Sequence, residues 1–249
     1  MLTFGVKFLN GLGAFGYLLL EVLGNLRYVF RDRRRVFYQF EHIGLNSIPL
    51  VMLIGFFAGA IIAWEAAYQV KGLVSLSILG GQVVKVITME MGPVMTSLVL
   101  AGRIGASMTA EIGSMKVSDQ VDALRTMGID PVRYIVLPRF AGLTVMLPIL
   151  CIFACLIGTM GAFIVSDYFL EISPATFLDS IKMFFTPWDL VGGLIKSLIF
   201  GITISLIGCY MGLTTTGGAK GVGTSTIMSF VYSAICILVG DFFLWLVLY

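Results

Sequence analysis

Residues 43–64 read IGLNSIPLVMLIGFFAGAIIAW, a stretch of 22 residues without a charged side chain. A helix needs roughly 20 apolar residues to cross the hydrocarbon core of a bilayer. Inside lipid every backbone N–H and C=O must be satisfied within the segment, which a helix achieves and an irregular loop does not. Residues 43–66, with Trp64 and Glu65 as interfacial groups at the far end, are therefore predicted to form the first membrane-spanning helix.

Four further stretches have the same character. The whole chain is 58% hydrophobic and 12% charged, with a mean hydropathy of +0.99, whereas a soluble domain carries about 25% charged residues. The strands of a membrane barrel would be shorter and would alternate apolar and polar residues. The sequence therefore predicts an all-α membrane protein, a single domain over residues 1–249, with five spans at 43–66, 73–106, 140–165, 191–213 and 227–249.

The N-terminal segment, residues 1–26, is apolar but its uncharged part is too short to span a bilayer, which takes roughly 20 residues. We expect it to form a helix that lies in the membrane interface or dips into it.

Lysine and arginine are concentrated before the first span and in the loop after the second span, and the loop after the fourth span holds Lys220. The loops on the other side hold only Lys71 and Lys182. The positive-inside rule then places the N-terminus in the cytoplasm and the C-terminus on the far side of the membrane. The net charge of +2 is too small to indicate a nucleic-acid partner.

The sequence contains no convincing catalytic or metal-binding motif. The four cysteines lie in apolar runs and the single histidine, His42, is far from them, so no metal site is expected. Residues 11–16 match GxGxxG but follow no strand, and residues 217–226 (GGAKGVGTST) lack the spacing of a phosphate-binding loop. The chain is therefore predicted to be neither an enzyme nor an ATPase, and to bind no cofactor of its own.

Residues 118–128 (SDQVDALRTMG) are predicted to form a short helix between the second and third spans. Ser118 is a candidate N-cap, Asp119 and Asp122 suit the first turn, and Gly128 suits a left-handed C-terminal position. Its apolar residues recur on one face: Val117, Val121 and Leu124. That face can pack on the chain's own membrane domain, lie on the lipid, or fill a groove in a soluble partner whose motion it would pass into the spans.

Charged residues also occur within the spans. Glu90 lies near the middle of the second span and is followed by Gly92 and Pro93, which predict a kink because proline removes a backbone hydrogen bond. An acidic group at this depth normally faces a partner or a wet cavity. Two alternatives stay open for Glu90: a structural pair with Lys85 or Lys196, or a cavity wall that meets a lipid headgroup. Asp241 is expected to be solvated at the outer end of the fifth span.

The central run EMGPV…LAGRIGAS…AEIGSMKVSDQVDALRTMGIDPVRYIVLPRF, from Glu90 to Phe140, resembles the signature region of the MlaE/YrbE permeases. A later segment, GGAKGVG…DFFL (217–244), resembles the family's C-terminal part, so the resemblance covers the chain from the first span onward. One departure is Met89, which stands where some members carry arginine. An ion pair at that position in the family is therefore not implied for this chain.

The resemblance implies a homodimer that pairs with two cytoplasmic ABC ATPase subunits, which bind ATP and Mg²⁺, and with Mce-domain proteins on the far side of the membrane. In some systems a small STAS-domain protein joins them. It also implies which residues act. Those coupled to the ATPase would lie in and around the helix at 118–128: Glu111, Val117, Asp119, Val121, Asp122, Leu124 and Arg125. Those that line the lipid cavity would be Glu90, Met91, Ile62, Val70 and Leu73.

The expected function is that of a permease subunit in the inner (cytoplasmic) membrane of a Gram-negative bacterium. It would move phospholipid or a related lipid between that membrane and the periplasmic Mce assembly, with the energy supplied by ATP hydrolysis in the partner. Two other classes stay open: a secondary lipid transporter driven by an ion gradient, which would need an intramembrane path of ionisable groups, and a membrane scaffold that transports nothing.

Overall fold

The computed structural model describes residues 2–29, 31–70 and 76–249, with side chains from residue 13 onward. Most of these residues are helical and no strand occurs among them. Five of the helical runs are long and apolar enough to cross a membrane, which confirms the predicted fold class. They are Arg33–Val70, Leu76–Val117, Val132–Tyr168, Pro187–Leu213 and Gly218–Leu248.

These runs divide into named helices. The first comprises α2 (Arg33–Ile43) and α3 (Ile48–Val70), joined by a 3₁₀ turn. The second comprises α4 (Leu79–Val86), α5 (Gly92–Leu100) and α6 (Ala106–Val117). The others are α8 (Leu137–Tyr168), α10 (Pro187–Leu213) and α11 (Gly218–Leu248), while α1 (Leu2–Asn25), α7 (Gln120–Thr126) and α9 (Pro174–Phe184) lie outside them.

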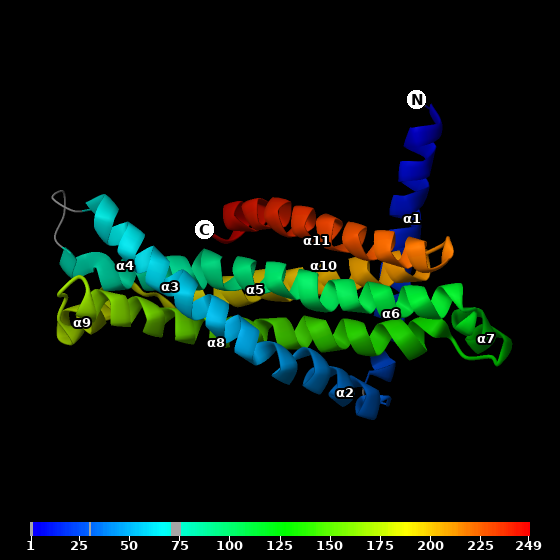
Figure 1. Ribbon diagram of the computed structural model, residues 1–249, viewed down its shortest axis with the longest axis horizontal. Helices are drawn as coiled ribbons and strands as arrows, with labels where there is room; N and C mark the ends of the chain where they lie inside the picture. The colour runs from blue at the N-terminus through cyan, green and yellow to red at the C-terminus, as the bar shows by residue number, and fades with distance from the viewer. Residues whose placement is uncertain (1, 30, 71–75) are drawn as a thin grey trace.

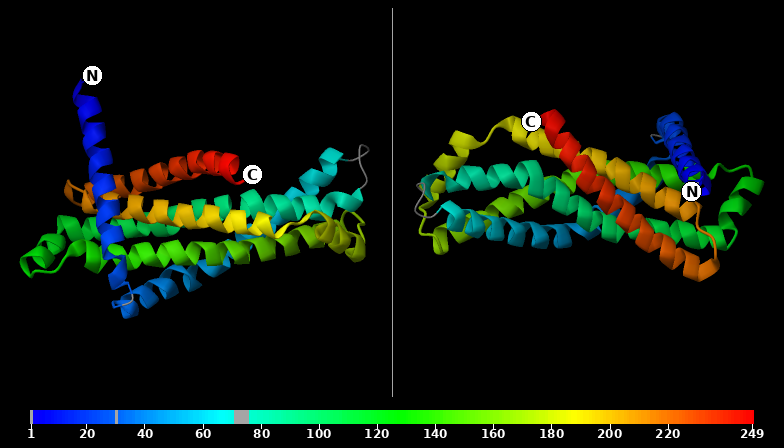
Figure 2. Two further views of the ribbon diagram at one scale, coloured as in Figure 1. Left: turned by 180° about the vertical axis from the view of Figure 1, so that it is seen from behind. Right: turned by 90° about the horizontal axis from the view of Figure 1, so that it is seen from above.

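The molecule is an elongated bundle whose two ends differ. One end carries α7 and the other carries α9 (Figure 1). Helix α1 lies across the long axis near the α7 end, where it packs against α10 and residues 132–136 (Figures 1 and 2). The run of 42 residues from Leu76 to Val117 is about 63 Å long at 1.5 Å per residue. Because a hydrocarbon core is only about 30 Å thick, this rod extends well beyond it.

The break expected at Gly92 and Pro93 takes the form of a widened turn. Residues Ile87–Met91 are π-helical, and the N–H of Gly92 bonds to the carbonyl of Ile87, five residues back. A π turn accommodates the donor that Pro93 lacks, and such turns occur often at functional sites. A second π turn, Ala101–Gly105, interrupts the second run, and a third, Val132–Val136, begins the third run.

Glycines set the closest helix contacts. On α3, a Cβ at Gly55 would lie 2.8 Å from the carbonyl oxygen of Ala154, and a Cβ at Gly59 would collide with Gly158. On α10, Gly208 lies against the backbone of Gly105 and Gly201 lies against that of Leu143. Small residues let helix backbones approach where lipid supplies no hydrophobic drive for association. Helix α8 is therefore packed closely against both α3 and α10.

The short helix between the second and third runs is present, but two details of the prediction are wrong. Helix α7 begins at Gln120 after Asp119, whose backbone is left-handed with φ 58°, and Ser118 does not cap it. The Ser118 hydroxyl instead donates to the carbonyl of Ser114, 2.7 Å away, at the end of α6. The C-terminal prediction holds: Gly128 has φ 74°, and the N–H of Ile129 bonds to Leu124 O in a Schellman motif.

Candidate functional site

An ion network links the π turn Ile87–Met91, α10 and α11 inside the bundle. Lys196 on α10 has no exposed surface, and its Nζ lies 2.7 Å from Glu90 Oε1 and 2.9 Å from Asp241 Oδ1. Of the two partners left open for Glu90, the structure therefore selects Lys196. The side chains of Glu90 and Asp241 are 27% and 19% exposed, so the carboxylates can be reached from outside while the ammonium cannot.

Asp241 corrects an expectation. It was expected to be solvated at the outer end of the last span, yet it is a partner of Lys196 within the bundle. With both carboxylates ionised, the three groups carry one net negative charge. A charge at membrane depth is costly unless it is paired. This cluster is therefore a place where a proton, a cation or a polar headgroup would interact with the protein.

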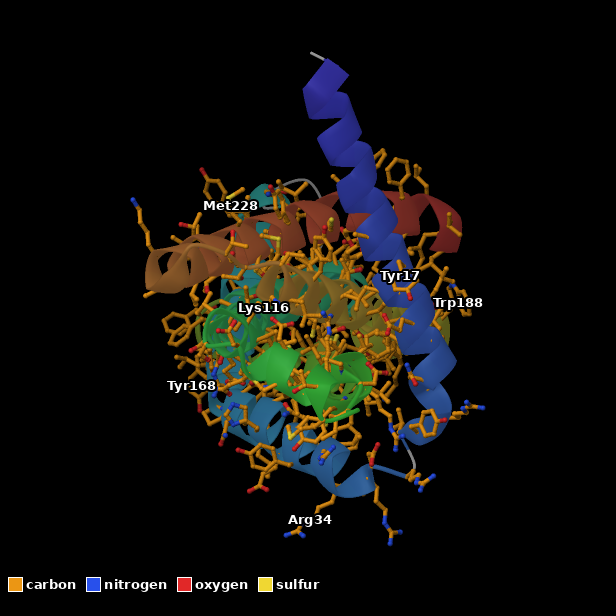
Figure 3. The ribbon with its side chains drawn as sticks, turned by 90° about the vertical axis from the view of Figure 1, so that its right-hand side faces the viewer. Tyr17, Arg34, Lys116, Tyr168, Trp188 and Met228 are labelled. Carbon is orange, nitrogen blue, oxygen red and sulfur yellow. The ribbon has the colours of Figure 1, made fainter. Side chains whose placement is uncertain are left out.

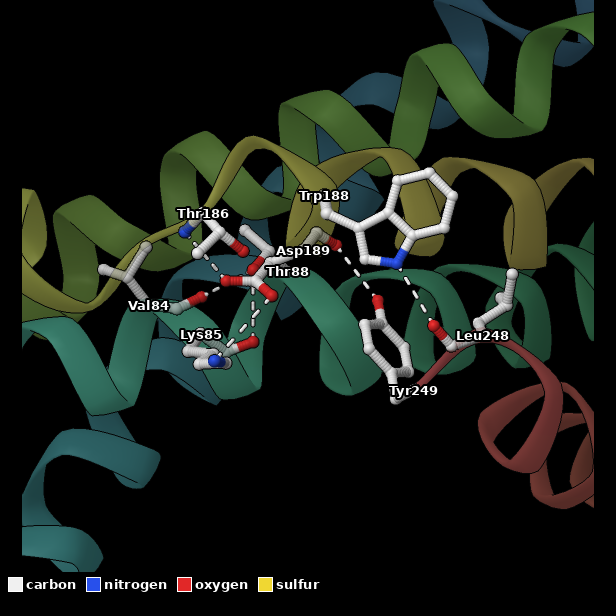
Figure 4. Close-up of polar contacts among 8 residues, drawn as sticks. All are labelled: Val84, Lys85, Thr88, Thr186, Trp188, Asp189, Leu248 and Tyr249. Carbon is white, nitrogen blue, oxygen red and sulfur yellow. Dashed lines mark hydrogen bonds and ion pairs between the residues drawn. The ribbon is translucent and has the colours of Figure 1, made fainter.

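A second polar contact set lies nearby, toward the α9 end. Asp189 in the first turn of α10 accepts a bond from the backbone N–H of Thr186 and lies 3.9 Å from Lys85 Nζ. The Tyr249 hydroxyl donates to Asp189 O, and the Trp188 indole N–H donates to the carbonyl of Leu248 (Figure 4). These bonds tie the last residues of α11 to the start of α10.

An apolar crevice runs between α3, α5 and α8. Met91, Met95 and Val99, spaced four residues apart, line one wall, and small residues of α3, including Gly55 and Gly59, line the other. Thr96 is the one hydroxyl-bearing residue among the lining residues. The crevice therefore offers a surface for hydrocarbon, and Met91, the residue that follows Glu90, is among its lining residues.

The predicted lipid-cavity residues do not share one wall. Met91 lines the crevice and Glu90 belongs to the ion network. Ile62 packs instead with the cluster between α3, α4 and α8, and Val70 ends α3. Leu73 lies outside the described residues.

The apolar face of α7 is buried against the chain itself. Val121 is 1% exposed and packs in a cluster with Leu18 and Val22 of α1, which Leu124 also contacts. Of the three alternatives for this stripe, the burial of Val121 favours packing on the chain's own domain, because α1 and the start of the third span cover this face. The coupling of Val121 and its neighbours to an ATPase stays a prediction. The surface of α7 left free is the opposite one, which includes Gln120, Ala123 and Met127, the last 64% exposed.

Charges fix α7 in place. Lys116 Nζ lies 2.7 Å from Asp122 Oδ2, and this hydrogen bond lowers the pKa of Asp122. Arg125 extends from the same helix and lies 3.6 Å from Asp122. On α6, Glu111 is paired with Arg139 at 3.0 Å. Val117 is half-buried where α6 ends.

Helix α1 brings one more carboxylate to this end. Burial raises the pKa of Glu21, and the nearby Asp130 raises it further, while Arg125 acts in the opposite direction.

Two charged residues were missed by sequence reasoning. Arg103 lies in the second π turn, and its Nη1 donates to Ser47 Oγ at 2.6 Å. Asp189 reads as an ordinary first-turn acid, and only the folded chain brings Lys85 to it. The π turn at Arg103 has no sequence signal that would have indicated it. Among the described residues, no three His, Cys, Asp or Glu side chains are placed to hold a metal ion.

Comparison with known proteins agrees with this architecture. The family model described as "Permease MlaE" matches residues 36–247. A protein described as a probable ABC transporter permease from Synechocystis sp. is 39% identical over 216 residues, 86% of this chain and 82% of that protein. One from Rickettsia conorii is 35% identical over 237 residues, 95% of this chain and 92% of that protein.

A plant relative is also similar. The chloroplastic protein TRIGALACTOSYLDIACYLGLYCEROL 1 of Arabidopsis thaliana is 37% identical over 211 residues, which are 85% of this chain and 60% of that protein. A family model that covers most of the chain, together with the Synechocystis and Rickettsia relatives matched over 82% and 92% of their length, settles the assignment: this multi-pass membrane protein belongs to the MlaE permease family and is a permease of the ABC transporter type.

Proposed function

We propose that this permease moves phospholipid or a related lipid between the inner membrane and an assembly of Mce-domain proteins on the far side. The observation that carries the proposal is the junction at residues 90–91. There Glu90, a member of the charged network with a partly exposed carboxylate, is followed directly by Met91, which lines the apolar crevice. The name of the Arabidopsis relative, which contains that of a glycerolipid, supports a lipid substrate.

The two halves of the junction match the two halves of a lipid. Dispersion and exclusion of water favour an acyl chain along Met91, Met95 and Val99, because that wall offers little with which a sugar or an ion could bond. Glu90 retains a partly exposed carboxylate while Lys196 behind it is buried. We infer that Glu90 meets the polar headgroup and that Lys196 holds its carboxylate in position.

The energy would come from a partner. The motifs considered in the sequence give this chain no nucleotide-binding loop, so ATP and Mg²⁺ would bind to cytoplasmic ABC ATPase subunits, two for each permease homodimer. The free face of α7 supports a contact with them, because it presents Gln120, Ala123 and the exposed Met127 at one tip of the molecule. A STAS-domain protein would join through the ATPase.

Transport in a reconstituted system tests the proposal. Proteoliposomes that contain the permease and its ATPase, and a fluorescent phospholipid, should show lipid movement that requires ATP and stops when the ATPase's phosphate-binding lysine is replaced. Glu90→Gln should slow the movement while the ATPase still co-purifies, and Glu65→Gln, on an exposed stretch of α3, is the matched control. Movement that continues with the inactive ATPase would contradict the proposal.

A secondary lipid transporter is the alternative, and the Glu90–Lys196–Asp241 network is the observation that favours it, because ion-driven transporters use such intramembrane groups. The same vesicles separate the two functions. A pH or sodium gradient imposed without ATP should leave the lipid where it is if the proposal is right, and should move it if the alternative is right. A scaffold would move no lipid under either condition.

A further inference from the structure

A strongly basic groove lies between the beginning of α2 and residues 134–139, where the third run begins. Five arginines line it, together with a single carboxylate: Arg31, Arg33, Arg34, Arg35 and Arg139, with Asp32. It lies apart from the crevice and the ion network described above. The positive-inside rule accounts for basic residues on this side of the membrane, but not for their gathering in one groove.

The excess is not neutralised within the chain. Asp32 is taken by Arg133, whose Nε lies 3.1 Å from Asp32 Oδ2, and Arg139 is paired with Glu111. In the part of the chain that the structure describes, no carboxylate lies within 4.0 Å of the guanidinium groups of Arg31, Arg33, Arg34 or Arg35. Like charges gathered in a groove raise the local potential and attract an anion.

Arg35 shows how the groove is shaped. Its guanidinium lies over the ring of Tyr134 at 3.8 Å from the centroid, a stacked arrangement that arginine favours and that leaves its N–H groups free at the ring's edge. Arginine offers several donors in a planar fork that matches the oxygens of a phosphate. The groove is thus built for a phosphate-like group as well as being positively charged.

A second, largely apolar groove continues from the first. Arg34 and Tyr38 line both grooves, and the second adds four apolar residues and one carboxylate, Glu41. The apolar residues are Phe37, Phe40, Leu45 and Met146. Phe37, Tyr38 and Leu45 are 65%, 64% and 60% exposed, an unusual set of apolar groups for a surface in contact with water. A ligand that fits both grooves must have an anionic head next to an apolar tail.

The position along the bundle agrees with such a ligand. Helix α2 precedes the first membrane-crossing helix on the side where lysine and arginine are concentrated, and α1 lies crosswise near the same end. Arg34 projects outward from α2 at the edge of the molecule (Figure 3). We propose that this double groove binds one anionic phospholipid of the cytoplasmic leaflet, with its phosphate among the arginines and an acyl chain along Phe37 and Leu45.

An acidic protein surface is the other macromolecule that could meet these arginines. The exposed aromatic and aliphatic side chains beside them favour the lipid, because polar protein would leave Phe37 and Leu45 in water, whereas an acyl chain covers them. The site is independent of the proposed transport, since it would hold a lipid whether or not the protein moves one.

Native mass spectrometry of the full-length protein in detergent tests the site. Titration with dioleoyl phosphatidylglycerol should yield one tight adduct per chain, and dioleoyl phosphatidylcholine should bind more weakly. Arg31→Gln combined with Arg34→Gln should weaken the phosphatidylglycerol adduct about thirtyfold, because each arginine near an anionic leaflet contributes roughly a factor of five. The matched control, Arg27→Gln with Lys220→Gln, removes the same charge from the same side and should leave the adduct unchanged.

Several results would overturn the proposal. Equal affinity for the two lipids, or equal losses in the two double variants, would show that the groove is not selective. Displacement of the lipid by inorganic phosphate at similar concentration would make it a small-anion site. Loss of the ATPase from Arg31→Gln/Arg34→Gln with the lipid adduct retained would make it a protein interface. Should that variant misfold, the salt dependence of the wild-type phosphatidylglycerol adduct tests the site. The affinity of that adduct must fall as the salt concentration rises, and an affinity independent of salt contradicts the proposal.

Discussion

Helices α10 and α11 follow each other in the chain and are almost equally apolar, yet the fold uses them in opposite ways. The most apolar window of α10 has a mean hydropathy of 2.1 and that of α11 has 2.2, but 56% of the first window is buried and only 11% of the second. Hydropathy therefore shows that both helices enter the membrane and does not show which surface each of them faces.

Small residues explain the difference. Helix α10 presents glycines on several sides, and the backbones of α6, α8 and the π turns Ile87–Met91 and Ala101–Gly105 approach it there: Gly193, Gly201, Gly208 and Gly212. Helix α11 packs through one narrow stripe, Ser229, Ser233 and Ile237, which are fully buried and four residues apart. The rest of α11 is left to lipid or to another chain.

The largest effect should come from the lysine that joins the two helices. Lys196→Met leaves Glu90 and Asp241 without their cation. Removing one partner from a buried ion cluster costs about 3–5 kcal/mol, which thermal unfolding in detergent should report as a large fall in Tm. Lys182→Met is the matched control, because Lys182 is 77% exposed beside Asp179, and its Tm should not change measurably.

A rescue variant tests whether the loss of stability in Lys196→Met is due to unpaired charge. Adding Glu90→Gln and Asp241→Asn to Lys196→Met removes every charge of the network, so much of the lost stability should return. An unchanged Tm in Lys196→Met would mean that the network does not hold α11 to the bundle. A triple variant no more stable than the single one would mean that the loss is due to packing and not to unpaired charge.

A smaller effect should come from adding a single methyl group, which we expect α10 and α11 to tolerate differently. A Cβ at Gly193 on α10 would collide with the carbonyl oxygen of Thr88, whereas a Cβ at Gly240 on α11 would meet Phe200 Cε1 at an ordinary 3.6 Å. Gly193→Ala should therefore destabilise the protein by about 1–3 kcal/mol through overpacking. Gly240→Ala should leave stability unchanged or raise it by up to about 1 kcal/mol, because alanine favours the helix.

Thermal unfolding of the two alanine variants under identical conditions measures this pair. Equal Tm values would contradict the contrast between a helix packed on several sides and a helix packed on one.

Much of this fold could be predicted from the sequence, because charge-free runs of sufficient length admit no other structure in lipid. The ends of the helices were harder to predict from the sequence. Helix α11 begins at Gly218 and not at 227, since residues 218–226 are small and polar and read as a loop although they continue the helix. Ser118 shows the same difficulty at short range, because its hydroxyl bonds backward to α6 and not forward to α7.

The site was predictable only in part. Glu90 was identified because an acid at membrane depth is rare, and Lys196 was one of two candidate partners. Asp241 was not identified as a partner of Lys196, because its position in sequence suggested the membrane surface. Only the packing of α11 on α10 brings the two side chains together. The apolar stripe of α7 was recognised, but amphipathic spacing does not show which surface covers it, and here that surface is α1.

The smallest effect on stability should come from the bare face of α11, and it is also the most informative about assembly. Leu238, Phe242 and Leu246 lie four residues apart and are 57%, 61% and 61% exposed. If the proposed homodimer forms through this face, replacing all three by alanine should leave the Tm of the monomer nearly unchanged, because they pack on little within the chain, and should shift the protein from dimer to monomer in size-exclusion chromatography with light scattering.

Helix α8 supplies the matched control for that triple variant, because it too has an exposed apolar face. Alanine at Phe153, Leu156 and Met160, which are 38%, 62% and 54% exposed, removes a comparable amount of hydrocarbon and should leave the dimer intact. Dimers that persist in the α11 variant would mean that this face meets lipid. Dimers lost equally in both variants would mean that association depends on total apolar surface and not on a specific seam. Only loss confined to α11 supports a defined interface, which explains why a helix as apolar as α10 is left so little covered by its own chain.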